Sequence, residues 1–246
     1  MLITSSQNEG LKNLRKLLRD KKARREQGLF VCEGVTLVKD IPDTFSVETV
    51  YLKASKETEL SFIVEKYPDR TVYVKDELFD AVGDTVNPSG VIALVRMPNT
   101  EKIVSGDTVL LLDGVSDAGN LGTIIRSAAA RGIETVVLAD CADAYAPKTV
   151  RAAMSGTFFT RIIECGKDEA FDLLSEYDIV ALDMGGNDIY SYERKGKIAL
   201  TVGNEAHGLS KEIREKAAII LAIPMQGKVE SLNAAVSISI AMFLIR

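Results

Sequence analysis

The last fifth of the chain constrains the fold most, because two short apolar runs are each followed by a polar turn that contains glycine. The runs are residues 198–202 and 219–223, and the turns that follow them are 203–210 and 224–233. Apolar runs of this length are typical of buried parallel strands. Ligands bind parallel sheets where strands end, so we expect both turns to line one crevice.

A third segment has the same form earlier in the chain. An apolar run at residues 109–112, ending at Asp113, precedes a turn at 114–122 and a predicted helix at 123–131, which carries Arg126. A long apolar helix is predicted from about residue 233 to residue 244. Alternating strands and helices predict an α/β domain with a parallel sheet.

The three turns resemble the three sequence motifs of the SpoU-type (TrmH-like) RNA ribose 2′-O-methyltransferases of the SPOUT superfamily. Residues 120–126 match Asn-x-Gly-x-x-x-Arg, residues 203–209 match Gly-Asn-Glu-x-x-Gly-Leu, and residues 223–233 match Ile-Pro-Met-x-Gly-x-x-x-Ser-Leu-Asn. All three occur in the family's order and at similar spacing. One departure is Ala118, which follows Asp117 where the family often has proline.

The resemblance implies a fold, a cofactor and an activity. It implies a SPOUT methyltransferase domain at residues 107–246, with a deep trefoil knot that periodicity alone does not reveal. It also implies S-adenosyl-L-methionine as the cofactor, methyl transfer to a ribose 2′-hydroxyl of RNA, and a homodimer. We expect ribosomal RNA as the substrate, because related enzymes that act on tRNA usually lack an N-terminal domain like the one predicted here.

The resemblance also assigns site residues. It places five residues near the reacting centre, namely Arg126, Asn120, Glu205, Ser231 and Asn233. It places the cofactor among Gly203, Ile223, Leu232, Leu182 and Met225.

Each catalytic candidate also has a structural interpretation. Arg126 is a base in some descriptions of the family, but a guanidinium stays protonated, so we favour binding of phosphate and of the developing 2′-oxyanion. Asn120 and Ser231 are residue types that cap helices. Glu205 is expected to orient Arg126 through a charge-assisted bond. His207 is interpreted as a loop residue.

A basic helix is predicted at residues 8–27, where leucines recur at spacings of three and four. Residues 1–30 contain eight Lys and Arg but three Asp and Glu, although the whole chain has a net charge of −5. Such asymmetry indicates a basic contact surface on an acidic protein. The predicted RNA-binding residues are Lys12, Arg15, Lys16, Arg19, Lys21, Lys22, Arg24 and Arg25.

This helix belongs to a predicted small α/β domain at residues 1–98. Strands are expected at 29–32, 47–52, 71–74 and 90–95, with helices between them and a tight turn at 86–90. The domain resembles the substrate-binding domain of many SpoU-type rRNA enzymes. A polar linker is expected at residues 101–106.

Several other classes are disfavoured. No apolar run reaches the ~18 residues of a membrane span, and the N-terminus lacks a signal-peptide core, so a cytoplasmic protein is expected. Three separated cysteines, Cys32, Cys141 and Cys165, with one histidine indicate no metal site. Neither dinucleotide-binding nor P-loop glycine spacing is present.

Two alternative functions remain open at this stage. One is a tRNA 2′-O-methyltransferase. The other is a non-catalytic RNA-binding or ribosome-assembly factor with the same fold, against which the intact motif residues argue.

Overall fold

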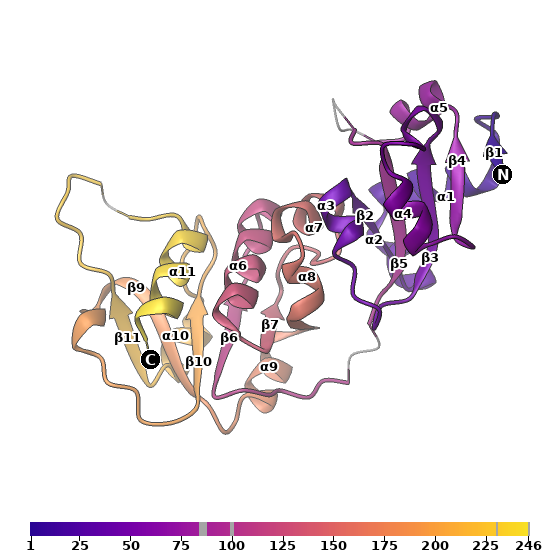
Figure 1. Cartoon of the computed structure of the whole chain (residues 1–246). Helices are drawn as coiled ribbons and strands as arrows, with labels where there is room; N and C mark the ends of the chain where they lie inside the picture. The colour runs from indigo at the N-terminus through magenta and orange to yellow at the C-terminus, as the bar shows by residue number, and fades with distance from the viewer. Residues whose placement is uncertain (84–87, 99–100, 230, 246) are drawn as a thin grey trace. The chain divides into compact units, whose positions relative to one another are not determined.

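The structure is a computed structural model that describes residues 1–83, 88–98, 101–229 and 231–245. The chain divides into two compact units (Figure 1). The first comprises Met1–Asn99 with Tyr145–Arg151, and the second comprises Thr100–Ala144 with Ala152–Arg246. The boundaries predicted from sequence assign residues 145–151 to the second domain. The predicted turn at 86–90 lies partly outside the described residues.

The first unit is built on a mixed five-stranded sheet in the order β1-β4-β3-β5-β2. The strands are β1 (Leu2–Ile3), β2 (Leu29–Glu33), β3 (Val47–Lys53), β4 (Thr71–Val74) and β5 (Val91–Arg96). The helices are α1 (Glu9–Arg19), α2 (Lys21–Gln27), α3 (Val35–Lys39), α4 (Ser61–Lys66) and α5 (Asp76–Asp80), with a 3₁₀ turn η1 (Ala54–Lys56).

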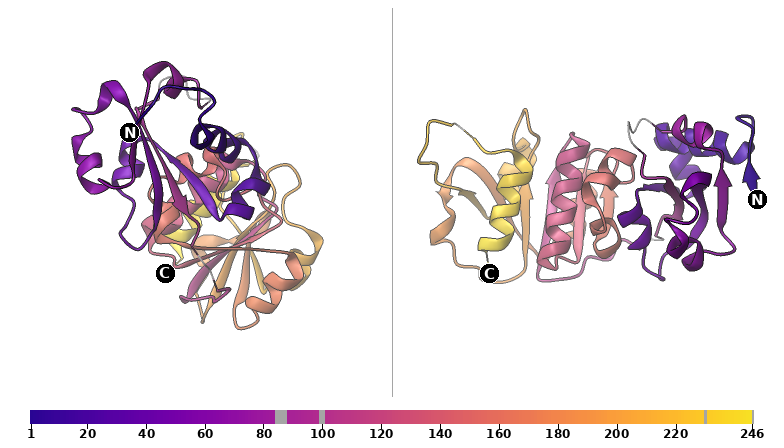
Figure 2. Two further views of the ribbon diagram at one scale, coloured as in Figure 1. Left: turned by 90° about the vertical axis from the view of Figure 1, so that its right-hand side faces the viewer. Right: turned by 45° about the horizontal axis from the view of Figure 1, so that its top comes forward.

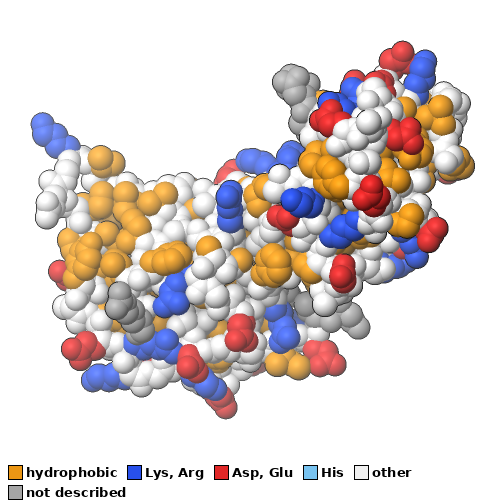
Figure 3. Space-filling model, in the orientation of Figure 1, with side chains coloured by type: hydrophobic (Ala, Val, Ile, Leu, Met, Phe, Trp, Pro, Cys, Tyr) orange, Lys and Arg blue, Asp and Glu red, His pale blue; other side chains and the backbone are white. Residues whose placement is uncertain are grey.

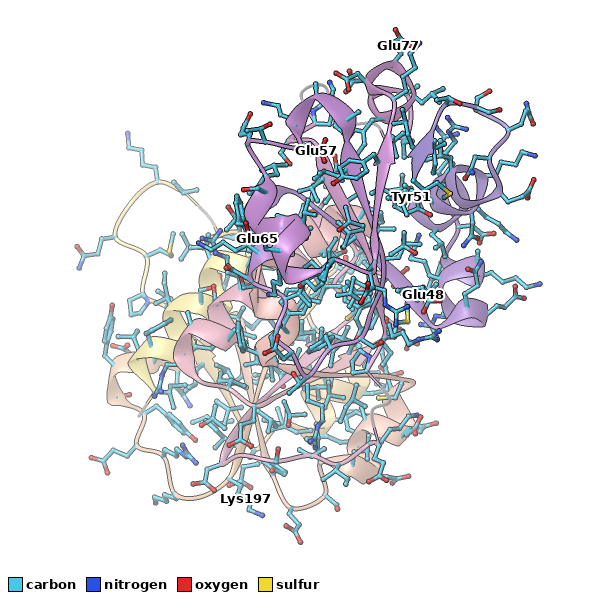
Figure 4. The ribbon with its side chains drawn as sticks, turned by 45° about the vertical axis from the view of Figure 1, so that its right-hand side comes forward. Glu48, Tyr51, Glu57, Glu65, Glu77 and Lys197 are labelled. Carbon is cyan, nitrogen blue, oxygen red and sulfur yellow. The ribbon has the colours of Figure 1, made fainter. Side chains whose placement is uncertain are left out.

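Both faces of this sheet are covered. Leu11, Leu14 and Leu17 of α1 are fully buried and pack with alternate residues of β5 and β2. The intervening residues of β5 are buried as well, and α3 contacts β5 and β2. The near-continuous apolar sequence of β5 reflects burial on both faces. Acidic side chains such as Glu57, Glu65 and Glu77 project from the surface of this unit (Figure 4).

The predicted single helix at residues 8–27 is wrong, because the structure has two helices that meet at Asp20. Asp20 adopts an extended conformation, with φ −111° and ψ 109°. Its carboxylate accepts hydrogen bonds from the backbone N–H groups of Lys22 (2.8 Å) and Ala23 (3.3 Å). A side chain that caps the next helix competes with helix continuation, which explains the break.

The second unit contains a six-stranded sheet in the order β11-β9-β10-β6-β7-β8, and every strand pair is parallel. The strands are β6 (Thr108–Asp113), β7 (Thr135–Ala139), β8 (Arg161–Cys165), β9 (Asp178–Asp188), β10 (Ile198–Val202) and β11 (Ile219–Ala222). The predicted parallel α/β architecture is confirmed. β9 runs without a break through residues 184–186 to Asp188.

Helices cover both faces of this sheet. α9 (Lys167–Leu173) and α10 (Lys211–Lys216) pack on one face, where they form a core with β6, β7 and β10. α6 (Ala118–Arg131), α8 (Gly156–Phe159) and α11 (Ala234–Leu244) lie side by side on the other face (Figure 2). A 3₁₀ turn, η2 (Ile189–Ser191), completes this unit, whereas most of α7 (Pro147–Ala153) falls in the segment assigned to the first unit. None of the helices among the described residues has the length and apolarity to cross a membrane.

The cap at Asp20 is testable by substitution. Asp20→Ala is expected to lower the free energy of unfolding by about 0.5–2 kcal/mol, because two helix N–H groups lose their acceptor. Asp20→Asn is the matched control, since asparagine caps about as well. Chemical denaturation of the three proteins checks this, and an Ala variant as stable as the Asn variant would contradict it.

Candidate active site

The carboxyl end of β10 leads into a tight loop, Gly203–Gly208. Asn204 and Gly208 exchange two backbone hydrogen bonds, of 2.9 and 2.8 Å. The side-chain amide of Asn204 donates to the backbone oxygen of Gly114 at 2.8 Å, which ties this loop to the turn after β6. A Cβ at Gly203 would overlap the carbonyl of Gly208, so only glycine fits there.

Glu205 joins this loop to the turn after β6. Its carboxylate accepts hydrogen bonds from the N–H (3.1 Å) and Oγ (3.0 Å) of Ser116. It also accepts from the N–H of Asp117 (3.2 Å) and the side-chain amide of Asn120 (2.9 Å). The expected bond from Glu205 to Arg126 is absent among the described residues, because the carboxylate is occupied by these four donors.

Asn120 extends the connection to the third motif. Its side-chain oxygen accepts from the side-chain amide of Asn233 at 2.9 Å. The oxygen of Asn233 in turn accepts from the N–H groups of Ala235 (2.9 Å) and Val236 (3.3 Å), at the start of α11. One chain of hydrogen bonds, Asn233–Asn120–Glu205, therefore joins the three motifs.

The helix caps differ from those predicted. Asp117, rather than Asn120, caps α6 by accepting from the N–H of Asn120 at 2.9 Å. Asn233, rather than Ser231, caps α11. Asp117 and Asn233 are themselves strong N-cap residue types, so the sequence is compatible with both observed caps.

The electrostatic state of Glu205 follows from these contacts. Partial burial raises the pKa of Glu205. The hydrogen bonds from Asn120, Ser116 and Asp117 together lower it by more than burial raises it, so the pKa lies below its usual range. The carboxylate is therefore ionised at neutral pH. An ionised carboxylate accepts hydrogen bonds only, which suits its four donors.

A pocket of about 600 Å³ lies beside this hydrogen-bond chain, between the middle of β9, the carboxyl end of β10 and the turn after β11. All five predicted cofactor residues line it, as do Glu205, Ser231 and Asn233. Other lining residues are not among the five predicted cofactor residues, namely Asp183, Met184, Val202, Arg214, Leu221 and Ser237. The strand pairing explains why Asp183 lines the pocket. β9 and β10 are parallel and Ala181 lies opposite Thr201, so the residues just after both reach the same edge of the sheet.

Arg126 lies on the exposed side of α6 and does not line the pocket. It makes no hydrogen bond or ion pair within the described part of the chain. A Cβ at Gly156 of α8 would lie 2.9 Å from the Cα of Arg126, so α8 packs closely against α6 at this residue. Arg126 is thus free to bind an anion beside Asn120, one to two helical turns away.

The eight predicted RNA-binding residues have different environments. Arg24 is 3% exposed and donates to the backbone oxygen of Leu17 at 2.6 Å, so its prediction as an RNA contact is contradicted by burial. Lys12 and Lys22 are exposed but form ion pairs with Glu9 and Glu26. Arg15 is half-buried and donates to Ser6. Lys16, Arg19, Lys21 and Arg25 are exposed.

The remaining candidates carry no evident chemistry. His207 is exposed in the loop after β10. Burial raises the pKa of the thiols of Cys32, Cys141 and Cys165, which disfavours the nucleophilic thiolate. Among the described residues no group of His, Cys, Asp and Glu has the arrangement of a metal site.

Comparisons with known proteins match both units. Residues 107–243 match the SpoU rRNA Methylase family, and residues 8–93 match the MRM3-like substrate binding domain. The chain is 32% identical to the 23S rRNA (guanosine(2553)-2′-O)-methyltransferase RlmP of Bacillus subtilis, over 99% of this chain and 98% of that protein.

Two solved structures are similar along almost the whole chain. The AdoMet-bound rRNA methyltransferase from Sinorhizobium meliloti is 28% identical, with a TM-score of 0.87, over 99% of this chain and 96% of that one. The SpoU methyltransferase AviRb from Streptomyces viridochromogenes, in complex with the cofactor AdoMet, is 26% identical, with a TM-score of 0.86, over 97% of each chain.

The role of Glu205 is testable by pH. Glu205→Gln is expected to lower the thermal midpoint at neutral pH by about 2–4 °C, since the new amide N–H₂ must face two donors. Because folding lowers the pKa of Glu205, its ionised carboxylate stabilises the fold at pH values above the ordinary glutamate pKa. This stabilisation is lost as the pH falls through the lowered pKa. The difference between the two proteins should therefore begin to shrink as pH falls below the ordinary glutamate pKa of about 4.3, and it should vanish only below the lowered pKa of Glu205.

Thermal unfolding of both proteins between pH 3 and pH 8 measures this. Glu215→Gln is the matched control, because Glu215 lies exposed on α10 and pairs only with Lys211 within the described residues. A constant difference between wild type and Glu205→Gln at all pH values would show that the charge of Glu205 is not what stabilises the loops.

Proposed function

Because the chain belongs to the SpoU rRNA Methylase family, we infer that it is an S-adenosylmethionine-dependent methyltransferase acting on a ribose 2′-hydroxyl of ribosomal RNA. The observation that carries this function is the pocket beside the Asn233–Asn120–Glu205 chain. A relative that covers nearly the whole chain is a 23S rRNA enzyme, so we propose 23S rRNA as the substrate. Action on ribosomal RNA fits the expected cytoplasmic location.

The pocket suits the cofactor in size and in chemistry. Leu182, Ile223 and Leu232 supply apolar walls for an adenine ring, and Gly203, where a Cβ would overlap the Gly208 carbonyl, lets the glycine loop fold tightly beside the pocket. Met225 lies at the rim. We propose that these five residues hold the cofactor, which supplies an electrophilic methyl group on its sulfonium.

The other motif residues are proposed to position the RNA. Arg126 binds a phosphate and stabilises the negative charge that develops on the 2′-oxygen, because its guanidinium has no competing partner among the described residues. Asn120 and Asn233 are held by Glu205 and the α11 amides, so their amides are fixed before RNA binds. Ser231 lies at the pocket beside them. Such positioning lowers the barrier to in-line transfer.

The exposed basic residues of α1 and α2 are proposed to contact RNA phosphates, as is Arg15 beside them. The match to an MRM3-like substrate binding domain over residues 8–93 supports this role. Arg24 is excluded because it is buried. Lys16 and Lys21 are the strongest candidates, since neither forms an ion pair within the described residues.

A homodimer is proposed from the surface of α11. Val236, Phe243 and Leu244 are 40–55% exposed on a helix that is apolar except for Ser237 and Ser239. Figure 3 shows hydrophobic side chains gathered on this part of the second unit. Exposed apolar surface of this kind commonly marks an interface between proteins.

The family's trefoil knot is likewise proposed for this chain. β11 lies at the edge of the sheet beside β9, whereas the next element, α11, packs against β10 and α6. The chain therefore returns inward past β9 after β11, as a knotted path requires.

Transfer to RNA tests the proposed function directly. Purified protein with tritiated S-adenosylmethionine is expected to label 23S rRNA from cells that lack this enzyme, and the label should persist in alkali-resistant dinucleotides, because a 2′-O-methyl group blocks alkaline cleavage. Label on tRNA alone would overturn the choice of rRNA. A folded dimer that binds no cofactor would overturn the enzymatic function in favour of an RNA-binding factor.

Arg126→Ala is expected to reduce transfer by about 10²–10³-fold, a typical loss for one donor to a developing oxyanion, with little change in cofactor binding or thermal stability. Lys197→Ala is a control, because Lys197 is exposed at the amino end of β10, opposite the site, and pairs with Glu176 (Figure 4). Single-turnover transfer with saturating RNA measures the effect. Equal rates for both variants would contradict the role of Arg126.

Lys16→Ala combined with Lys21→Ala is expected to weaken rRNA binding and to flatten its salt dependence by about 1.5–2 units of log–log slope, since two phosphate contacts are lost. Lys75→Ala is the control, because Lys75 pairs with Glu77. Filter binding at several salt concentrations measures the slope. An unchanged slope would show that these lysines do not contact phosphates.

A further inference from the structure

We propose that Asp183 binds the ribose hydroxyls of the cofactor and that Arg214 is a positioning residue that fixes the Asp183 carboxylate. Neither residue belongs to the three motifs, and both line the pocket. This inference rests on the proposed function, because it assigns one part of S-adenosylmethionine to one part of its pocket.

Few charged side chains line the pocket. They are Asp183, Glu205 and Arg214, with the exposed His207 in the same loop as Glu205. The carboxylate of Glu205 already accepts four hydrogen bonds from Ser116, Asp117 and Asn120. Asp183 is therefore the acidic side chain of the pocket that retains capacity to accept from a ligand.

The fold places Asp183 at the edge where ligands bind. β9 pairs in parallel with β10, and Ala181 lies opposite Thr201. Asp183 follows two residues further along β9, and its Oδ2 would lie 4.0 Å from a Cβ at Gly208, in the loop after β10. Its side chain is 20% exposed, so it lies largely within the wall of the pocket.

The orientation of the carboxylate is set by two contacts. Oδ1 accepts from the N–H of Gly185 at 3.3 Å. Oδ2 accepts from a terminal nitrogen of Arg214, which projects from α10. A Cβ at Gly208 would lie 4.0 Å from this oxygen and 3.9 Å from the Arg214 nitrogen, so the pair lies against the loop after β10.

This arrangement matches a vicinal diol. A carboxylate has about four lone-pair sites, and Asp183 uses two, which leaves acceptors for two hydroxyl donors. Dinucleotide-binding folds likewise use an acidic side chain to bind the hydroxyls of a ribose. Arg214 cannot perform this role, because a guanidinium only donates.

The amino-acid end of the cofactor fits this pair less well. Its ammonium would need the free lone pairs of Asp183 and its carboxylate would need the remaining N–H groups of Arg214, so both side chains would have to face the ligand at once. A diol requires only the free lone pairs of Asp183, and the ion pair stays intact. The geometry therefore favours ribose.

Calorimetric titrations with three classes of ligand test the assignment. S-adenosylhomocysteine carries every part except the methyl group, 5′-methylthioadenosine lacks the amino-acid end, and the 2′- and 3′-deoxy forms of 5′-methylthioadenosine each lack one hydroxyl. Wild type is expected to prefer 5′-methylthioadenosine over both deoxy forms by about tenfold, since charged hydrogen bonds are lost.

Asp183→Asn is expected to weaken S-adenosylhomocysteine and 5′-methylthioadenosine by the same factor, about 10–100-fold, and to reduce the preference over the deoxy forms severalfold. Glu215→Gln, an acid-to-amide change on α10, should bind like wild type. Weakening confined to S-adenosylhomocysteine would assign Asp183 to the amino-acid end and overturn the proposal. Equal weakening of all ligands, or none, would overturn it too.

Arg214 is tested by its effect on KM and kcat. Arg214→Met is expected to raise the KM for S-adenosylmethionine about tenfold and leave kcat unchanged at saturation, and Arg214→Lys should recover most of the affinity. Lys211→Met, on the same helix, is the control. A fall in kcat with unchanged KM would overturn the positioning role.

These titrations distinguish failure of the proposed function from failure of the role assigned to Asp183. Wild type that fails to bind S-adenosylhomocysteine contradicts the proposed function itself. Wild type that binds it, while Asp183→Asn keeps the full discrimination against deoxy ligands, contradicts only the role of Asp183.

Discussion

The carboxylate of Glu205 holds the site together, because it is where the turns after β6 and β10 meet. Four donors converge on it, and one of them, the amide of Asn120, passes the connection to Asn233 and the start of α11. Three segments far apart in the sequence thereby become one rigid wall. An ionised acceptor is essential to this arrangement, since a neutral amide cannot satisfy two pairs of donors.

The hydrogen-bond chain borders the pocket between β9, β10 and the turn after β11, which has apolar walls and the Asp183–Arg214 pair. α6 carries Asn120 of this chain and also Arg126, which is exposed and has no competing partner among the described residues. In the proposed reaction, the methyl donor and the ribose hydroxyl meet beside Asn120 and Asn233.

Sequence reasoning succeeded where local pattern and burial agree. The strands at 71–74 and 198–202 have the predicted ends, because each apolar run is bounded by polar or glycine-rich sequence. The predictions of helix starts and ends were wrong where a polar side chain bonds the backbone of one particular turn. Asp20 breaks one predicted helix into two, and Asp117 and Asn233 cap helices that were expected to begin with other caps.

The sequence by itself determined the parallel α/β architecture, the three motif turns and the family, since each depends on residue type and spacing along the chain. Tertiary structure decided which partners those residues take. Glu205 bonds the turn after β6 rather than Arg126, Arg24 supports α1 from the interior, and Asp183 reaches the pocket opposite Arg214. Such contacts join residues from separate elements, and only the packed sheet and helices fix their distances.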